Sequence, residues 1–209
     1  MESILASTED HLLSNLSFKI PRHGASYVQS KDQATFWPQG GNVYSDTTGQ
    51  KILRIALASE GYMDLSRLTF SFDLTNTGAN VMTPLVSGTH SLFSRVRVLI
   101  SGTEVENIEY YSVVSEMFNR LLPYEKKANT ALMGFAGNTI AAGATKNLIH
   151  MPKILGMCNQ PLWLPGFALG AAGCVLELHL ADGNEVFQSG EGQNTEYALS
   201  DCRVLADVY

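Results

Sequence analysis

Residues 90–123 contain the pattern that most restricts what this chain can fold into. In Ser94–Ile100 apolar and polar residues alternate, which is the period of a β-strand with one buried face. A glycine-containing turn at Ser101–Thr103 and a second short extended piece follow. From Tyr110 the apolar residues recur at three- and four-residue steps, which predicts one amphipathic helix that ends at Pro123. The block therefore predicts a β-sandwich that carries one helix in a loop.

Further segments with strand character recur along the chain at fairly regular intervals. The clearest is Arg67–Leu74, in which apolar residues alternate with polar ones. Lys51–Leu57 has apolar residues in both alternating sets, which predicts a strand covered on both faces. The glycine- and alanine-rich stretch Met133–Thr145 predicts a long loop. The predicted strands are Ala34–Trp37, Lys51–Leu57, Arg67–Leu74, Ser94–Ile100, Lys146–Met151, Cys174–Leu180, Glu185–Gln188 and Glu196–Tyr209.

The number and spacing of these strands select a fold class. Eight strands joined by long connections favour a jelly roll over an immunoglobulin-like or up-and-down topology. The chain lacks the alternation of strands and helices that a doubly wound α/β fold requires. We therefore expect an all-β fold, an eight-stranded jelly-roll sandwich with one helix in a long loop. A chain of 209 residues suits one domain of this kind.

The sequence divides into an amino-terminal arm, residues 1–25, and a single jelly-roll domain, residues 26–209. Ser7–Asp10 matches a helix capping box in front of three leucines, so a short helix is predicted in the arm. The arm either docks under a neighbouring subunit or frays, and the sequence favours neither. Because the last predicted strand runs to Tyr209, the chain could be one segment of a longer, two-barrel protein.

The charge pattern argues against tight nucleic-acid binding. Charged residues make up 16% of the chain, the net charge is −6, and no basic run is longer than Lys126–Lys127. Neutralising many phosphates needs clustered cations, so we expect no sequence-specific nucleic-acid partner. A largely neutral surface is often covered by copies of the same protein, although an ordinary domain with polar loops has the same composition.

Cysteine usage and hydropathy bear on where the chain works. Cys158, Cys174 and Cys202 form no closely spaced metal-ligand pair, and their odd number favours a reducing compartment. We expect Cys174 and Cys202 to be small buried hydrophobic residues within strands. No apolar run reaches the roughly 18 residues that span a bilayer, and the amino terminus lacks the basic region of a signal peptide. The product is therefore expected to stay soluble where it is made.

Few residues suggest chemistry. The chain has no phosphate-binding loop, no nucleophile elbow and no H-E-x-x-H helix. His90 and Ser91 are adjacent, but neighbours on an extended chain point to opposite faces, so we expect His90 to contact backbone at a strand entrance. His150 and His179 would form a metal site only if their strands were neighbours. We assign no catalytic, cofactor-binding or metal-ligating residue, expect no cofactor, and predict that the protein is not an enzyme.

Two acidic clusters have simpler structural interpretations. Glu104, Glu106 and Glu109 crowd the segment after Ile100, and paired carboxylates can serve acid–base chemistry or hold calcium. Glu106 and Glu109 also lie just before the predicted helix, where the helix dipole favours negative charge. Asp182–Asn184 could likewise ligate calcium, but a turn is the simpler interpretation.

Four aromatic residues in loop-like segments suggest an alternative function. Trp37, Tyr44, Tyr62 and Trp163 look exposed and could form a platform on which sugars stack. Because they are spread over several loops, core or subunit-contact roles are favoured. They keep open the alternative of a carbohydrate-binding jelly-roll module. A third possibility, a cupin-like metalloenzyme, requires histidines that converge inside the barrel.

Four segments resemble, in order along the chain, the double-jelly-roll major capsid proteins of tailless icosahedral DNA viruses of the polinton-like, virophage and large-DNA-virus kind. The segments are FWPQGGNVYSDTTGQKILRI (36–55), GYMDLSRLTFSFDL (61–74), HSLFSRVRVLISGTEVENIEYY (90–111) and YALSDCRVLADVY (197–209). The strongest part is the block H-S-L-F-x-R-V-R-V-L-x-x-G-T-E-V-E. The resemblance covers most of the chain.

This resemblance implies a structural capsid subunit without catalysis, located in the virion and assembled inside the host cell. Such barrels stand upright in the shell and associate as trimers of pseudo-hexagonal outline. The implied partners are therefore further copies in a trimeric or pseudo-hexameric capsomer, other capsid proteins, and a nearby internal viral membrane. The segment Tyr110–Leu122 looks like the helix that such barrels carry in one long loop. Those proteins have two barrels, so this chain is either an amino-terminal half or a single-barrel shell protein.

Overall fold

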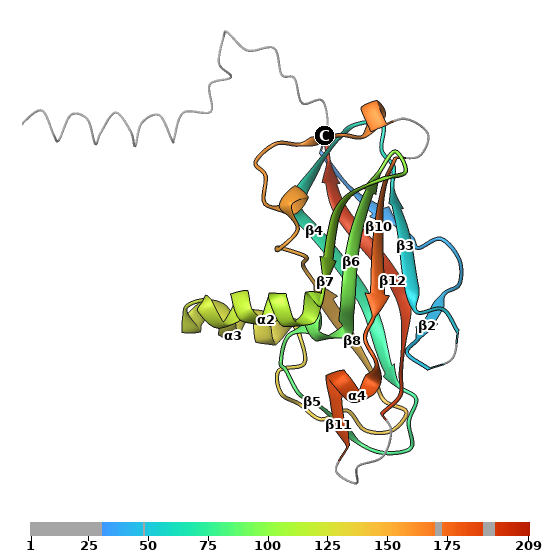
Figure 1. Ribbon diagram of the computed structural model, residues 1–209, viewed down its shortest axis with the longest axis vertical. Helices are drawn as coiled ribbons and strands as arrows, with labels where there is room; N and C mark the ends of the chain where they lie inside the picture. Colours follow the sequence, from blue (N-terminus) through green and yellow to red (C-terminus); the bar gives the residue numbers. More distant parts are fainter. Residues whose placement is uncertain (1–30, 48, 170–172, 190–194) are drawn as a thin grey trace, which may run out of the picture.

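The computed structural model describes residues 31–47, 49–169, 173–189 and 195–209 (Figure 1). The predicted arm, residues 1–25, and its short helix lie outside the described residues. Eight long strands of the described chain form two facing sheets. One sheet has the order β1 (Asp32–Phe36), β12 (Tyr197–Val208), β4 (Tyr62–Asn76) and β8 (Thr145–His150). The other has the order β3 (Ile52–Leu57), β10 (Cys174–Leu180), β6 (Phe93–Ile100) and β7 (Thr103–Glu109).

The pairing of these eight strands is nested. Counted in chain order, the first pairs with the eighth (β1 with β12) and the second with the seventh (β3 with β10). The third pairs with the sixth (β4 with β8) and the fourth with the fifth (β6 with β7), and all four pairs are antiparallel. This is the pairing of one long hairpin wrapped around a barrel, which defines a jelly roll. The predicted fold class is therefore confirmed.

Four short strands lie outside these eight, so the predicted count of eight is too low. They are β2 (Val43–Ser45), β5 (Met82–Pro84), β9 (Leu164–Pro165) and β11 (Phe187–Ser189). Each has two or three residues, which is too short to show an alternating pattern in the sequence. The strand predicted at Glu185–Gln188 is wrong in its first half, where the chain forms a single helical turn, α4 (Gly183–Val186), before β11.

The core lies between the two sheets and follows the predicted alternation. Leu68, Phe70, Phe72 and Leu74 of β4 are all buried, as expected for the clearest strand. The prediction that β3 is covered on both faces is wrong. Leu53, Ile55 and Leu57 are fully buried, whereas Ile52 and Arg54 face outward and are exposed. One face of β3 contacts the core and the other contacts solvent, because each sheet has only one partner layer.

The long loop between β7 and β8 holds two helices where one was predicted. Helix α2 (Tyr111–Leu121) matches the predicted helix. Leu122 is extended, with φ −72° and ψ 148°, because a residue before proline disfavours helical geometry. The carbonyl of Pro123 then accepts a hydrogen bond from Lys127 N, so the proline that ends α2 also begins α3 (Tyr124–Met133). Both helices project from one side of the barrel (Figure 1).

The described residues also contain three 3₁₀ turns: η1 (Thr89–Leu92), η2 (Gly156–Cys158) and η3 (Gly166–Leu169). The three cysteines are buried and unpaired, as predicted for Cys174 and Cys202. Burial raises the pKa of the Cys158 and Cys202 thiols to about 12 and that of Cys174 to about 11. Within the described part of the chain, every helix is too short or too polar to cross a bilayer.

Candidate interaction site around helix α2

Helix α2 rests on the barrel through a narrow strip of its surface. Tyr111 and Ser115, one turn apart on the same helical face, are its buried residues. A third attachment is polar: His90 Nε2 of η1 lies 3.2 Å from Glu116 Oε2. Gly88 makes room for this arrangement, because a Cβ atom at that position would collide with the His90 imidazole. The helix is thus held at its first turns, while its carboxyl-terminal half extends past the barrel.

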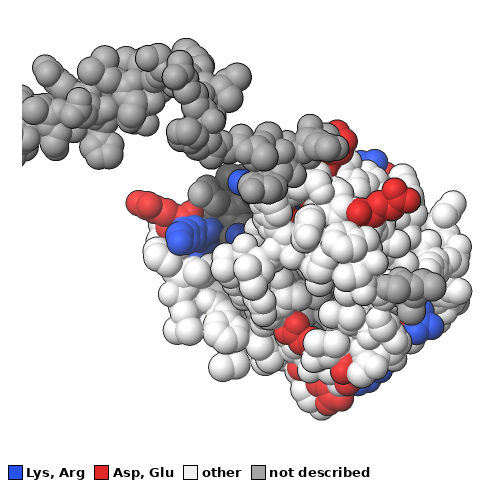
Figure 2. Space-filling model, turned by 90° about the horizontal axis from the view of Figure 1, so that it is seen from above, with Lys and Arg blue, Asp and Glu red and all other residues white. Residues whose placement is uncertain are grey.

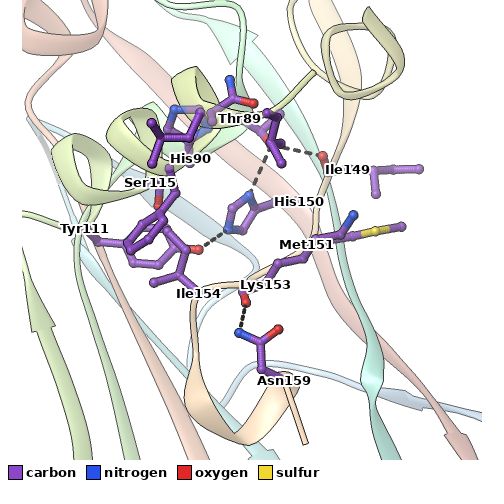
Figure 3. A pocket seen from close by; sticks show the side chains of 14 residues that line it. Thr89, His90, Tyr111, Ser115, Ile149, His150, Met151, Lys153, Ile154 and Asn159 are labelled. Atoms are coloured by element: carbon purple, nitrogen blue, oxygen red, sulfur yellow. Dashed lines mark hydrogen bonds between the residues drawn. The ribbon is translucent and has the colours of Figure 1, made fainter. Parts of the chain in front are cut away.

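Beneath α2 lies a cavity of 420 Å³ (Figure 3). Its walls come from α2, η1, the end of β8 and the segment 151–159. The lining is mixed, with apolar side chains from Phe118, Ile149 and Ile154 and polar ones from Lys153 and Asn159. Ser115 Oγ is buried in this wall without a hydrogen-bond partner. More of the lining surface is apolar than polar, so the cavity suits an occupant of mainly apolar character.

His150 forms the floor of the cavity and has both ring nitrogens satisfied. The Thr89 hydroxyl donates to the carbonyl of Ile149 at 3.0 Å, so its oxygen accepts from His150 Nδ1 at 3.2 Å. His150 Nε2 then accepts from the Tyr111 hydroxyl at 3.0 Å. Figure 3 shows these bonds converging on the imidazole. Burial, and secondarily the nearby His90, lowers the pKa of His150 to about 3, so the ring is neutral and fixed in one tautomer.

The surroundings of His90 and Glu116 lower the pKa of both groups. Burial lowers the pKa of His90, and the neighbouring Glu116 carboxylate only partly opposes this. Burial also disfavours the Glu116 carboxylate, but hydrogen bonds from Arg120 and Asn119, together with His90, outweigh it and lower the pKa of Glu116. The contact is therefore a hydrogen bond between a mostly neutral imidazole and a carboxylate, and it ties α2 to η1.

The structure separates the histidine and serine that are adjacent in sequence. The expected extended conformation at His90 is wrong, because η1 is a 3₁₀ turn. The expected backbone contact of His90 is also wrong, since its ring bonds to Glu116. Ser91 Oγ instead donates to the carbonyl of Gly88 at 2.9 Å. The two side chains therefore do not form the hydrogen-bonded base–nucleophile pair that nucleophilic catalysis needs.

His150 and His179 are not brought together. His150 is on the inner face of β8 in one sheet, and His179 is on the outer face of β10 in the other. The Nε2 atom of His179 is buried and has no hydrogen-bond partner. In the described ranges no three His, Cys, Asp or Glu side chains are placed to hold a metal ion.

The acidic residues after Ile100 diverge. Glu104 accepts from Arg97 Nε at 2.7 Å, and Glu106 accepts from the backbone N–H of Gly156 at 2.8 Å. Glu109 lies 3.6 Å from Arg95. Each carboxylate therefore has its own partner.

The second acidic segment, interpreted above as a turn, forms the start of the single helical turn α4. Asp182 occupies the residue before α4, and its carboxylate forms an ion pair of 2.9 Å with Lys51. Its carboxylate is therefore engaged with a cation of the protein itself.

The four aromatic residues do not form one platform. Tyr44 is completely buried, so its expected exposure is wrong. Trp37 is exposed beside β1, away from the others. Tyr62 and Trp163 each contact Tyr209: Tyr62 N donates to its carbonyl, and Trp163 stacks on its ring with a centroid distance of 4.2 Å. Sequence inspection did not select Tyr209, because its contacts are with residues distant in sequence.

The helices α2 and α3 carry an exposed apolar surface. Amphipathic helices normally turn such residues toward a core, yet these face solvent. Met117, Phe118 and Leu121 are 64%, 56% and 80% exposed. We use the name helical apolar surface for Tyr110, Val113, Met117, Phe118, Leu121, Leu122 and Tyr124. The helical period is visible in the sequence, but whether a helix faces the core or solvent depends on its angle to the barrel.

Comparison with known proteins places the fold. No family model matches the chain, and no curated protein matches it significantly. Among solved structures, PBCV-1 VP54, fitted into a cryo-EM reconstruction of the virophage Sputnik, aligns with a TM-score of 0.61 and 16% identity, covering 91% of this chain and 44% of that one. The Faustovirus major capsid protein aligns with a TM-score of 0.55 and 9% identity, covering 92% of this chain and 56% of that one. A chain of the Sputnik virophage structure aligns with a TM-score of 0.51 and 14% identity, covering 92% of this chain and 52% of that one.

The chain spans about half the length of these structures. It therefore has the fold of one barrel of the double-jelly-roll major capsid proteins, and the fold expected from the resemblance is confirmed. At this level of identity the likeness concerns the fold alone.

Proposed function

We propose that the protein is a structural subunit of a viral capsid, one jelly-roll barrel that assembles with copies of itself and performs no catalysis. The observation that supports this most is the alignment of nearly the whole chain with single barrels of major capsid proteins. In this proposal residues 26–209 form the barrel domain, and residues 1–25 form an arm. The protein is located in the virion after assembly in the host cell.

The helical apolar surface supplies the contact between copies. If a large apolar side chain offers about 200 Å² when fully exposed, the seven residues together present roughly 900 Å². A stable protein–protein interface buries about 800 Å² on each partner. A patch of this size is unusual on a protein that acts alone. Its position on a projecting pair of helices lets it reach a neighbouring barrel without distorting the sandwich (Figure 1).

The partners follow from the same comparison. Copies of this chain would associate as a trimeric or pseudo-hexameric capsomer, together with other capsid proteins. No sequence-specific nucleic-acid partner is proposed, since the net charge is −6 and the cations are scattered. Proximity to an internal viral membrane remains part of the proposal, because shells of this kind can enclose one.

The test is the oligomeric state of the purified chain and of two charged variants. Sedimentation velocity should show trimers or larger assemblies, and electron microscopy should show ring-shaped or shell-like particles. Leu121→Asp, in the helical apolar surface, should shift the protein to the monomer, because it introduces a charge into the contact. Val43→Asp is the matched control, since Val43 is 59% exposed but lies on β2. A monomer at high concentration, or equal effects of both substitutions, would contradict the proposal.

A further inference from the structure

A second exposed apolar patch lies at the end of the barrel where the chain enters and leaves it. The ring of Trp163 stacks on Tyr209, with an interplanar angle of 1°. Tyr62 N donates to the carbonyl of Tyr209 at 3.0 Å, and its ring meets Phe167 edge-on at 5.3 Å. These contacts link Tyr62, Trp163, Phe167 and Tyr209, and Leu162 directly precedes Trp163 in the chain; we name these five residues the end patch.

The end patch is exposed although it is rich in large side chains. Leu162 and Phe167 are 75% and 59% exposed, and Tyr62 and Trp163 are nearly half exposed. Figure 2 looks onto this end of the molecule, and most of the surface in view carries no charged side chain. Exposed aromatic residues grouped in this way mark an interaction site. The end patch is separate from the helical apolar surface, which projects from the side of the barrel (Figure 1).

The first described residue of the chain sits against this patch. Lys31 Nζ lies 5.2 Å from the centre of the Tyr209 ring and 2.9 Å from Asp207 Oδ2. Tyr209 is the residue on which Trp163 stacks. The thirty residues that precede Lys31 are therefore attached directly beside the end patch.

The sequence of that preceding segment is suited to an apolar partner. Leu12, Leu16 and Ile20 follow one another at four-residue spacing, which is one face of a helix. From Ile20 to Lys31 the chain can extend over roughly 35 Å, enough to return across the end of the barrel. A short tether also gives an effective concentration of the order of millimolar, so even weak apolar contacts suffice.

We propose that the end patch is the docking site for the chain's own segment 1–24, which lies across Trp163 and Phe167 through its leucine-rich face. A membrane surface is less suited to this patch, because anionic lipid is attracted by free cations. Lys31 and Arg67, which lie at this end, are both paired with Asp207. The proposal concerns a single chain and does not depend on capsid assembly.

Trp163 provides a direct readout. The chain has two tryptophans, so Trp37→Phe leaves Trp163 as the sole tryptophan, which is excited selectively at wavelengths where tyrosine does not absorb. In this background, Leu12→Asp with Leu16→Asp should detach the segment and increase acrylamide quenching of Trp163 about twofold, since an apolar contact no longer shields the indole. Ser14→Asp with Ser17→Asp is the matched control, adds the same charge to the same segment, and should change nothing. Equal quenching in the parent and both variants would overturn the proposal.

Photocrosslinking identifies the occupant. Phe167 is replaced by p-benzoylphenylalanine in the full chain, a change that its exposure allows, and Val43 is replaced likewise as the control. Links within one chain, from position 167 to residues 1–24, support the proposal. Links between two chains that grow with protein concentration would overturn it in favour of a second copy. Links that form only with phosphatidylserine-containing vesicles, and then to lipid, would overturn it in favour of a membrane.

Discussion

The Nε2 atom of His150 lies 3.0 Å from the Tyr111 hydroxyl, so the end of β8 is hydrogen-bonded to the first turn of the projecting helix α2. His150 belongs to β8, which follows the two-helix loop, and Tyr111 begins α2 at the start of that loop. The start of the loop is thereby fastened to the far end of the strand that follows it. The rest of α2 can then present its apolar side chains outward without loosening the sandwich.

Replacing Tyr111 by phenylalanine should destabilise the protein without emptying space in the core. The ring stays, but His150 Nε2 loses its donor and becomes a buried acceptor without a partner, which costs about 1–3 kcal/mol. Urea unfolding monitored by circular dichroism should show a lower midpoint and an unchanged m-value. Tyr124→Phe is the control, because Tyr124 is 84% exposed and should leave the midpoint where it is. Equal midpoints for Tyr111→Phe and the parent would refute the assigned bond.

The stability should fall in acid because of His150. The folded protein lowers the pKa of this ring from 6.5 to about 3, so between these values the unfolded chain binds one more proton there than the folded chain does. The contribution is fully present above pH 6.5 and is lost as the pH falls toward 3, with a slope of up to about 1.4 kcal/mol per pH unit.

The measurement is the free energy of unfolding in urea, at several pH values between neutral and mildly acidic, for the parent and His150→Asn. The His150→Asn variant should be less stable than the parent at neutral pH, but its asparagine has no titrating group. The two curves should therefore converge as the pH falls. Parallel curves would mean that His150 protonates equally in the folded and unfolded states.

How far the sequence predicts this structure differs from element to element. The alternation in Arg67–Leu74 predicts β4 and its buried face, because a long strand repeats its period several times. The helix from Tyr110 is predicted for the same reason, and its end follows from Pro123. Helix α3 was missed because its Lys- and Ala-containing sequence has little apolar periodicity. The fold class can be predicted because its long strands repeat a clear pattern. Short or weakly patterned elements cannot be predicted in this way.

The interaction surfaces could be predicted only in part. Sequence shows that Met117, Phe118 and Leu121 lie on one helix, but they would look the same on a helix packed into the core. Their exposure depends on the anchoring of α2 through Tyr111, Ser115 and Glu116, which involves residues distant in sequence. Tyr44 illustrates the converse: it follows a Gly–Gly–Asn turn that suggests exposure, yet tertiary contacts bury it.

Replacing Glu177 by glutamine should cost more than the same change at Glu104. Glu177 lies on the outer face of β10 but is only 3% exposed, and its carboxylate lies 2.6 Å from Arg54 and 2.9 Å from Arg97. Glu177→Gln leaves these guanidinium groups without their shared anion, at a cost of about 2 kcal/mol. Glu104 contacts the same Arg97 but is far more exposed, so Glu104→Gln should cost less than about 1 kcal/mol. Thermal or urea unfolding of the two variants compares them directly, and the reverse order would contradict the buried role of Glu177.

The three cysteines should be unreactive in the folded protein. The thiolate is the nucleophile, and burial raises the pKa of Cys158, Cys174 and Cys202 to about 12, 11 and 12. At mildly alkaline pH this leaves on the order of a thousandfold less thiolate than in a free cysteine. Labelling with Ellman's reagent should therefore be slow in buffer and should release three equivalents of thionitrobenzoate rapidly in denaturant. Its rate in buffer should rise in Tyr111→Phe, because labelling requires the core to open and that variant opens more often. Fast labelling of the native parent protein would show that at least one thiol is reached without unfolding.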